Sequence, residues 1–276
     1  DGAEISDLNL LPDKMFVLVD TELYFFPDDE IGEKIKVRLP SDDRTVDVEV
    51  LSSTPRLMLV KNFLSPSECE EIKDLARPQL QRSQVLAHGD QSNGKNAVAQ
   101  DVRTSSTAWL LDRTKPIVGK VRQRVQDLVK VPMTYSEDMQ VLRYGYKEHY
   151  HVHHDYFEPR LYPGDKRWES GHNRMITVFF YLETMEEGGE TVFPFSDPNL
   201  NEDDWKHVAT TGPCEKVPKG AIRVPAVQGH AIIFYSMKAK GHVKGALDMT
   251  SLHGGCDPIK GEKWAANYWI RNGNVQ

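Results

Sequence analysis

The chain has 276 residues, of which 39% are hydrophobic and 27% are charged, a composition typical of a globular protein and unlike that of a disordered chain. Its net charge of -7 disfavours a nucleic-acid partner, which binds best to a basic surface. The sequence contains no apolar run long enough to span a bilayer, so we expect no membrane contact by this segment. The chain begins at Asp1 without a methionine, so we expect either a trimmed mature form or a truncated one, with any targeting segment outside the sequence.

The first predicted element is a β-hairpin. Residues 34–39 and 46–51 alternate between polar and apolar side chains, and a Ser-Asp-Asp turn lies between them. Alternation with a period of two is typical of half-buried strands. We expect this hairpin to be structural and to belong to a strand-rich N-terminal extension, residues 1–51, which precedes a catalytic domain at residues 52–276.

Two helices follow. Ser65 can cap the first helix, Pro66 fits its first turn, and Glu68 completes a capping box. Pro78 should end or kink this helix. A second helix is predicted at residues 115–129, where apolar residues recur every three or four positions. Both apolar stripes predict core contacts.

The segment between the helices and the C-terminal half have different compositions. Residues 88–100 are rich in Gly, Asn and Ser and predict a mobile loop, of a kind that often covers a site. From residue 139 onward, short runs of β-branched and aromatic residues are separated by Gly, Pro and Asp. The pattern indicates an α+β fold in which N-terminal helices precede a β-sandwich or a jelly roll. Of these we expect the jelly roll, a double-stranded β-helix core with supporting N-terminal helices. The predicted strands are 139–144, 175–182, 222–224, 231–235 and 264–270.

The densest chemical signal is at residues 149–155, which read His-Tyr-His-Val-His-His-Asp. On an extended strand, alternate residues point to the same side, so His153 and Asp155 project together, and His151 can share that face. A histidine and a carboxylate at this spacing provide two ligands of the facial triad of non-haem Fe(II) oxygenases. Such a triad leaves positions open for O2 and a co-substrate. A zinc site or a plain polar strand fits the same cluster.

Several histidines further along the chain are candidates for a third ligand. They are His207, His230, His242 and His253. His253 lies in a Ser-Leu-His-Gly-Gly segment, which predicts a turn shortly before the final strand.

Lys263 opens that final strand. Alternation places Lys263, Asn267 and Trp269 on one face, and Trp264 on the other. A buried lysine needs an anionic partner, and a dicarboxylate co-substrate would provide one. In the alternative interpretation, Lys263 faces solvent and Trp264 is the core residue. Tyr144, which ends a strand before the histidine cluster, is either a hydroxyl donor to the same carboxylate or a core aromatic.

Three segments, residues 140–155, 174–194 and 251–271, closely resemble the prolyl 4-hydroxylase family, particularly its plant and algal members. The resemblance extends through residues 55–80 and 102–106 and covers the chain from Leu51 to its end. It implies an Fe(II)- and 2-oxoglutarate-dependent dioxygenase that hydroxylates prolyl residues at the 4-position in proline-rich peptides or proteins. Turnover would convert 2-oxoglutarate to succinate with O2, and ascorbate would restore iron that has been oxidised.

The resemblance also implies roles for individual residues. His153, Asp155 and His253 match the iron ligands, and Lys263 matches the lysine that binds the C5 carboxylate of 2-oxoglutarate; these four form the catalytic set. The remaining matched positions are Tyr144 and Thr191, which hydrogen-bond near that carboxylate, Trp269 in the pocket wall, and Glu137, Tyr150 and Arg174 toward the peptide groove.

The sequence departs from the family pattern at a few positions. Arg271 stands where the family usually has a histidine, and Asp257 separates Cys256 from Pro258, which usually follow one another. Arg271 lies near the expected peptide site, so we expect a changed substrate preference.

Three cysteines occur, Cys69, Cys214 and Cys256, without a Cys-x-x-Cys pair. Composition alone favours three free thiols. Members of the family carry cysteines at both the Cys214 and Cys256 positions, and this resemblance implies a disulfide as the alternative. A disulfide would favour the lumen of the endoplasmic reticulum, in the secretory pathway, over the cytosol.

Other functions remain open on the sequence. The enzyme could hydroxylate another side chain or a free amino acid. A non-catalytic peptide-binding jelly roll is a second alternative, and the intact set of metal and lysine positions argues against it. A zinc hydrolase is a third, but no residue pair is placed as base and nucleophile. The oligomeric state is not predicted.

Overall fold

The structure is a computed structural model that describes residues 30–83, 104–111, 115–158, 172–196, 217, 220–238 and 247–274. Its α-helices are α1 (Pro66–Ala76) and α2 (Pro116–Val129). The strands are β1 (Lys34–Leu39), β2 (Arg44–Ser53), β3 (Arg56–Val60), β4 (Gln81–Arg82), β5 (Ser106–Leu110), β6 (Met139–Tyr144), β7 (Tyr150–His153), β8 (Arg174–Tyr181), β9 (Glu187–Gly188), β10 (Thr191–Phe193), β11 (Ile222–Val224), β12 (Ala231–Tyr235), β13 (His253–Gly255), β14 (Pro258–Lys260) and β15 (Lys263–Arg271).

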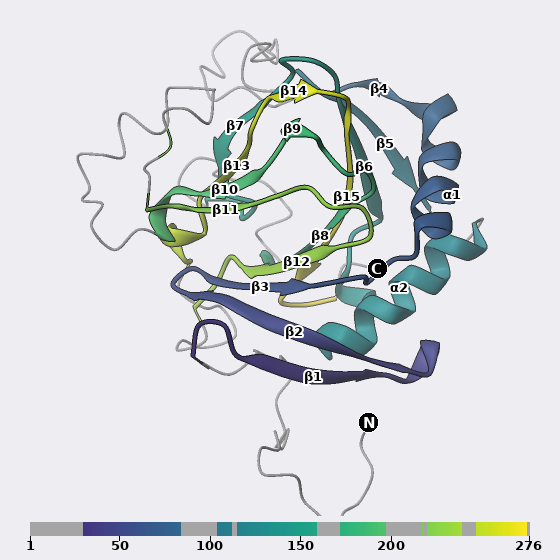
Figure 1. The fold of residues 1–276 in the computed structure, drawn as a ribbon. Coiled ribbons are helices and arrows are strands. Elements are labelled where there is room, and N and C mark those ends of the chain that lie inside the picture. The colour runs from purple at the N-terminus through teal and green to yellow at the C-terminus, as the bar shows by residue number, and fades with distance from the viewer. Residues whose placement is uncertain are drawn as a thin grey trace, which may run out of the picture.

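Two β-sheets face each other, as Figure 1 shows. The large sheet has the order β1-β2-β3-β12-β8-β15-β6-β5-β4, and the small sheet has the order β11-β10-β13-β7. A short pair, β14-β9, lies beside them. This architecture confirms the predicted jelly-roll core with supporting helices. In each sheet, strands that are far apart in sequence lie next to each other. Residues that are far apart in the chain therefore meet between the sheets.

The N-terminal hairpin forms as predicted. β1 and β2 pair antiparallel, from Lys34 opposite Glu49 to Leu39 opposite Arg44. β2 also pairs with β3, so the hairpin extends the large sheet. The predicted boundary at residue 51 falls within β2, and the division into two units stays a prediction.

Both helices pack against the face of the large sheet that is turned away from the small sheet (Figure 1). The capping box predicted for α1 is confirmed, because Ser65 accepts from the backbone N–H of Glu68 and the Glu68 side chain accepts from that of Ser65. α1 ends at Ala76, just before Pro78. The predicted stripe of α2 is also confirmed, because its apolar residues Val118, Val121, Val125 and Leu128 are fully buried.

A buried arginine joins the hairpin and both helices. Arg124 of α2 is 1% exposed, donates to the Glu68 carboxylate at 2.8 and 3.0 Å, and donates to Asp42 at 3.2 Å. It also donates to the backbone oxygen of Phe63 at 2.9 Å. Burial would raise the pKa of Glu68, but hydrogen bonds from Arg124 and the Ser65 backbone outweigh it and lower the pKa to about 2. No local sequence pattern indicates this ion cluster.

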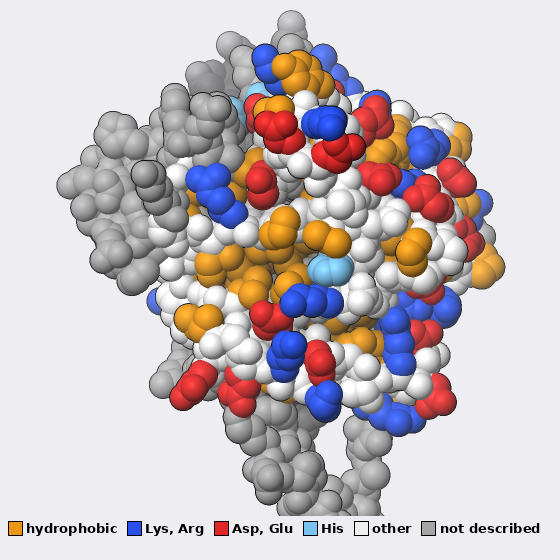
Figure 2. Space-filling view, in the orientation of Figure 1, with side chains coloured by type: hydrophobic (Ala, Val, Ile, Leu, Met, Phe, Trp, Pro, Cys, Tyr) orange, Lys and Arg blue, Asp and Glu red, His pale blue; other side chains and the backbone are white. Residues whose placement is uncertain are grey.

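On the face drawn in Figure 2, basic and acidic side chains are interspersed over β1 and β2. Lys36 pairs with Asp47 at 2.9 Å and Arg38 with Asp43 at 2.7 Å, all of them exposed. Exposed pairs of this kind contribute about 0–1 kcal/mol each, so they mark a solvated face more than a source of stability.

Across the described residues, none of the helices has the length and apolar character needed to cross a membrane.

The capping box generates a stability prediction. Ser65→Ala should lower the free energy of unfolding by about 1 kcal/mol, because the N–H of Glu68 loses its acceptor. Ser65→Gly should cost only a few tenths of a kcal/mol, since glycine is itself a good N-cap residue. Urea denaturation followed by circular dichroism measures both. Equal midpoints for the alanine variant and the wild type would show that the cap contributes nothing.

Candidate active site

A pocket lies between the two sheets. Strands of the large sheet, β6, β8, β12 and β15, and of the small sheet, β7, β10 and β13, supply its walls. Its lining residues are Gln140, Leu142, Tyr144, Tyr150, His153, Asp155, Thr177, Phe179, Thr191, Phe234, His253, Gly254, Gly255, Lys263, Asn267 and Trp269.

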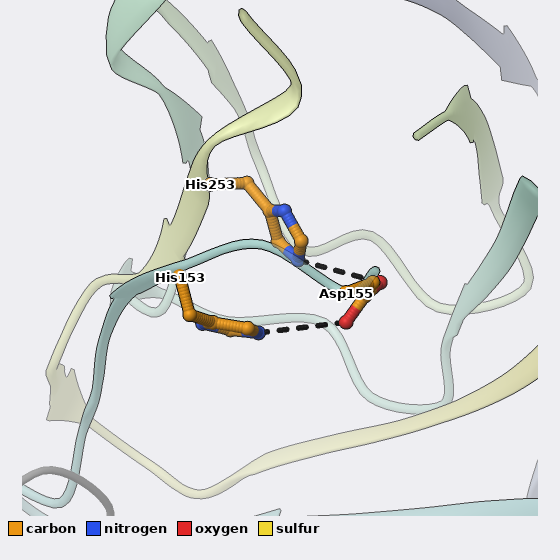
Figure 3. A group of neighbouring side chains, drawn as sticks. All are labelled: His153, Asp155 and His253. Carbon is orange, nitrogen blue, oxygen red and sulfur yellow. Dashed lines mark ion pairs between the residues drawn. The ribbon is translucent and has the colours of Figure 1, made fainter. Parts of the chain in front are cut away.

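Three of these side chains form a compact metal-binding group. His153 ends β7 and His253 begins β13, and the antiparallel pairing of these strands places the two residues opposite each other. Nε2 of His153 lies 3.6 Å from one Asp155 oxygen, and Nε2 of His253 lies 3.6 Å from the other (Figure 3). One ligand atom from each residue falls within 4.8 Å of the others.

Backbone packing explains why β13 can approach β7 so closely. A Cβ atom at Gly254 would lie 3.0 Å from a Val152 methyl carbon and 3.2 Å from the Val152 backbone nitrogen, so a larger residue would push the strands apart. The predicted turn at His253 is therefore wrong, because this residue begins a strand that pairs with both β7 and β10. Short glycine-containing strands carry no alternating pattern from which they could be predicted.

Backbone carbonyls set the protonation of both imidazoles. Nδ1 of His153 lies 2.8 Å from the backbone oxygen of His151, and Nδ1 of His253 lies 2.9 Å from that of Ser251. A carbonyl oxygen only accepts, so Nδ1 carries the proton and donates in both rings. In the neutral form of each ring Nε2 then carries the lone pair and faces Asp155, which is the arrangement found in metal-ligating histidines.

The charges of the group also suit a divalent cation. Burial alone would raise the pKa of Asp155, but the two imidazoles and Arg174 outweigh it, and the pKa lies well below its ordinary value. The Thr177 hydroxyl donates to Asp155 Oδ2 at 2.7 Å. Burial lowers the pKa of His253 to about 4. At neutral pH the group therefore presents one carboxylate and a neutral His253. This set of donor atoms fits a metal site formed by two histidines and one carboxylate.

Aromatic contacts fix the two rings. Tyr150 stacks on His153 with a centroid distance of 3.6 Å, and Phe234 and Phe193 lie 4.5 and 5.7 Å from His253. Such packing holds each ligand in one orientation before a metal arrives.

The other histidines of the cluster have different partners. His149 and His151 stack on one another at 4.6 Å, and His154 Nε2 lies 2.9 Å from the backbone oxygen of Met249. Within the described part of the chain the metal-binding group does not include His230. His207 and His242 lie outside the described residues.

Lys263 is the buried cation of the pocket. It is 2% exposed, so the interpretation in which it faces solvent is wrong, although Trp264 does belong to the core as that interpretation held. Among the described residues no hydrogen bond or ion pair reaches its ammonium group, which instead faces the rings of Phe179, Tyr144 and Tyr181 at 5.6 to 5.9 Å. Burial lowers its pKa to about 7, against a smaller opposing effect of Glu190. An anionic ligand would supply the missing partner.

Two of the predicted neighbours of Lys263 lie in the same part of the pocket. Tyr144 is directly opposite Lys263 in the β6–β15 pairing. Thr191 is buried on β10, and its hydroxyl accepts from the Tyr181 hydroxyl at 2.9 Å. The structure therefore gathers both residues around the lysine.

Among the residues predicted to face a peptide, Glu137 has its carboxylate occupied by two arginines of the protein itself. Arg174 donates to its two carboxylate oxygens at 2.8 and 2.7 Å, and Arg271 donates at 2.9 Å. The Arg174 guanidinium lies 3.4 Å from the centre of the Trp269 ring. Tyr150 lines the pocket itself.

Sequence reasoning missed two polar residues of the pocket, Thr177 and Gln140. Thr177 is a buried hydroxyl within the otherwise apolar core of β8, and that contrast was a usable signal. Gln140 lies in a strand that is buried almost throughout, which gave a similar but weaker indication.

Two predictions concern segments that lie outside the described residues. The loop at 88–100 and Cys214 both lie outside them. Cys69 is free and buried, whereas Cys256 is disulfide-bonded, so the prediction of three free thiols is wrong.

Comparison with known proteins agrees with this geometry. The sequence profile of the 2OG-Fe(II) oxygenase superfamily matches residues 139–271. Prolyl 4-hydroxylase 1 of Arabidopsis thaliana is 38% identical over 82% of this chain and 72% of its own, and prolyl 4-hydroxylase 2 of the same plant is 36% identical over 81% and 69%.

Solved structures support the fold. A viral collagen prolyl hydroxylase from Paramecium Bursaria Chlorella virus-1, in complex with 2-oxoglutarate, superposes with a TM-score of 0.52 at 22% identity. The match covers 78% of this chain and 95% of that one. A prolyl hydroxylase from Trichoplax adhaerens, in complex with a peptide fragment of hypoxia inducible factor, gives 0.50 at 14% identity over 80% and 85%.

The site predicts which histidine of the cluster binds metal. His153→Ala should weaken Co(II) or Zn(II) binding by more than about 100-fold, because even loss of an outer hydrogen bond to a ligand costs about 10- to 100-fold. His154→Ala is the matched control and should retain affinity within a few-fold. Isothermal titration calorimetry measures both, and equal losses in the two variants would contradict the assignment.

Proposed function

Because the chain belongs to the prolyl 4-hydroxylase family of 2OG-Fe(II) oxygenases, we propose that it hydroxylates prolyl residues at the 4-position in proline-rich peptides or proteins. The observation that carries this proposal is the pairing, in one pocket, of a two-histidine, one-carboxylate group with a buried lysine that has no anionic partner within the described residues. A metal site alone would fit many chemistries. The buried lysine also requires a ligand whose second carboxylate lies away from the metal-binding group.

Residues at the two ends of the pocket have different roles. His153, Asp155 and His253 would hold Fe(II), which when bound supplies the activation of O2 and the oxidation of the target C–H bond. Lys263 holds the C5 carboxylate of 2-oxoglutarate and thereby fixes the direction in which the co-substrate lies. The reaction consumes 2-oxoglutarate, O2 and a prolyl residue, and yields succinate, CO2 and a hydroxyprolyl residue, with one oxygen atom in each of the two oxidised products.

The mouth of the pocket has the chemistry expected for a proline-rich chain. Trp109 is 44% exposed and its ring lies 6.0 Å from that of Trp269, which lines the pocket. Tyr150 adds a third aromatic side chain, and the Arg174 guanidinium stacks on Trp269. Aromatic-lined grooves bind extended proline-rich segments, because the preformed polyproline conformation loses little entropy on binding.

Two further parts of the proposal concern conditions of turnover. Ascorbate would restore iron that has been oxidised in cycles without substrate, as the family resemblance implies. A secretory-pathway location, in the lumen of the endoplasmic reticulum, is favoured by the disulfide-bonded state of Cys256, since disulfides persist in oxidising compartments.

Mass spectrometry tests the substrate. The enzyme with Fe(II), 2-oxoglutarate and ascorbate should add one oxygen atom to proline residues of proline-rich peptides, and fragment ions should place it on proline. His153→Ala is the inactive control. Succinate formation with no oxidised peptide in a broad proline-rich panel would favour another target. Binding of peptide without any succinate would favour the non-catalytic alternative.

The low pKa of Lys263 predicts how co-substrate affinity depends on pH. Below pH 7 the ammonium form is already present, so affinity for 2-oxoglutarate should be nearly constant. Above pH 7 the free enzyme loses this proton and must take it up again on binding, so the apparent affinity should fall by up to about tenfold per pH unit. Calorimetry in buffers of different ionisation enthalpy should detect the proton uptake.

Lys263→Arg provides the control for this titration. A guanidinium stays charged across the whole range, so the variant should lose the decline above pH 7 even if its affinity is lower throughout. Effects of pH on the metal are common to both proteins and cancel in the comparison. A wild-type affinity that is flat from pH 7 to 9 would contradict the prediction.

A further inference from the structure

Asn267 is a buried polar side chain whose role in the pocket is unexplained by the residues described so far. It is 1% exposed, and within the described part of the chain neither its Nδ2 nor its Oδ1 has a hydrogen-bond partner. It lines the same pocket as Lys263 and the metal-binding group. Buried amides are rarely left unpaired, because the loss of water is not compensated, so an unpaired one calls for a ligand.

The position of Asn267 in β15 locates it within the pocket. Lys263, Asn267 and Trp269 share one face of the strand, and Asn267 lies about 13 Å along it from Lys263 at the usual rise per residue. Trp269 pairs with Thr177, whose hydroxyl donates to Asp155. The face of β15 therefore runs from the lysine to the metal-binding group, and Asn267 lies toward the latter.

A second buried donor lies at the same end. Trp269 Nε1 is also buried without a hydrogen-bond partner among the described residues. Its indole ring is covered by Arg174, which fixes it in the pocket wall. Two unpaired N–H donors, Asn267 Nδ2 and Trp269 Nε1, thus lie toward the metal-binding group, whereas Lys263 lies toward the other end of the strand face.

We propose that Asn267 binds the 2-oxo acid end of 2-oxoglutarate, through a hydrogen bond from Nδ2 to the C1 carboxylate oxygen that does not bind the metal. This inference rests on the proposed function, since it takes 2-oxoglutarate as the ligand. Lys263 would pair with the C5 carboxylate, and a metal held by His153, Asp155 and His253 would occupy only one oxygen of the C1 carboxylate. The second C1 oxygen would be buried and charged, and Asn267 supplies the donor that it needs.

Two substitutions of nearly the same shape isolate the donor. Asn267→Leu removes it, and should leave the ligand-free protein equally stable or more stable, because an unpaired buried amide is lost. Its affinity for 2-oxoglutarate should fall by about 10- to 100-fold, the usual value of a hydrogen bond to a charged group. Asn267→Asp also replaces the donor by a negative charge and should lose more than the leucine variant.

A shortened ligand identifies which end of the co-substrate is bound. Calorimetry with the Zn(II)-loaded enzyme compares 2-oxoglutarate with 2-oxopentanoate, which has the same chain but no C5 carboxylate. Asn267→Leu should weaken both ligands by a similar factor. Lys263→Met should weaken only 2-oxoglutarate, and the two substitutions should be close to additive because they act at separate ends.

The outcomes separate this inference from the proposed function. If the wild type fails to bind 2-oxoglutarate, the proposed function fails. If the wild type binds it and Asn267→Leu binds it equally well, only the role of Asn267 is overturned, and a raised peptide KM in that variant would place the amide against the peptide instead. A variant that weakens 2-oxoglutarate but not 2-oxopentanoate would overturn the assignment to the C1 end.

Discussion

The alternation of side chains along β15 is the constraint on which both the fold and the pocket depend. This strand pairs with β6 on one side and β8 on the other, at the centre of the large sheet. Trp264, Ala266, Tyr268 and Ile270 enter the core beneath the helices, where the Tyr268 hydroxyl donates to the backbone of Val118. Lys263, Asn267 and Trp269 face the pocket. A slip of one residue would place a lysine in the core, so core packing fixes the register of the site as well.

The polar groups buried in the pocket lower the stability of the sheet that carries them. A lysine and an amide are buried without partners among the described residues, and Asp155 depends on Thr177 and its neighbouring imidazoles. Fully buried apolar side chains such as Phe180, Val178 and Tyr268 offset this from the other face. Ligands that bind only the native state add stability that grows with the logarithm of their concentration relative to their dissociation constant. The unpaired groups that lower the stability of the ligand-free protein therefore also determine which ligand the pocket binds.

The sequence predicted most of what depends on local patterns. The strands 139–144, 222–224 and 231–235 match β6, β11 and β12 to the residue, and the Ser65 cap is where the capping box indicated. It did not predict β13 or the pairing that places His253 opposite His153, because three residues with two glycines have no period and the pairing joins positions far apart in the chain. It also could not separate His153 from the adjacent histidines with certainty, since their roles follow from the carbonyls and rings around them. Arg124 was missed because its partners come from three segments that meet only in the folded protein.

Chemistry and substrate selection occupy different parts of the same strand. Under the proposed function, the reacting end is set by residues whose partners lie deep between the sheets, whereas β15 ends at Arg271, which shares the Glu137 carboxylate with Arg174. There Arg271 and Arg174 together occupy the Glu137 carboxylate, with Arg174 held on Trp269 and Arg271 over Phe157. Two arginines against one glutamate leave this cluster with a net positive charge, and burial lowers the mobility of each group. Under the proposed function, a change at the end of β15 would alter the charge and shape that a peptide meets without moving Lys263 or the metal-binding group. We therefore propose that Arg271 changes which peptides bind while the residues of the family chemistry stay in place.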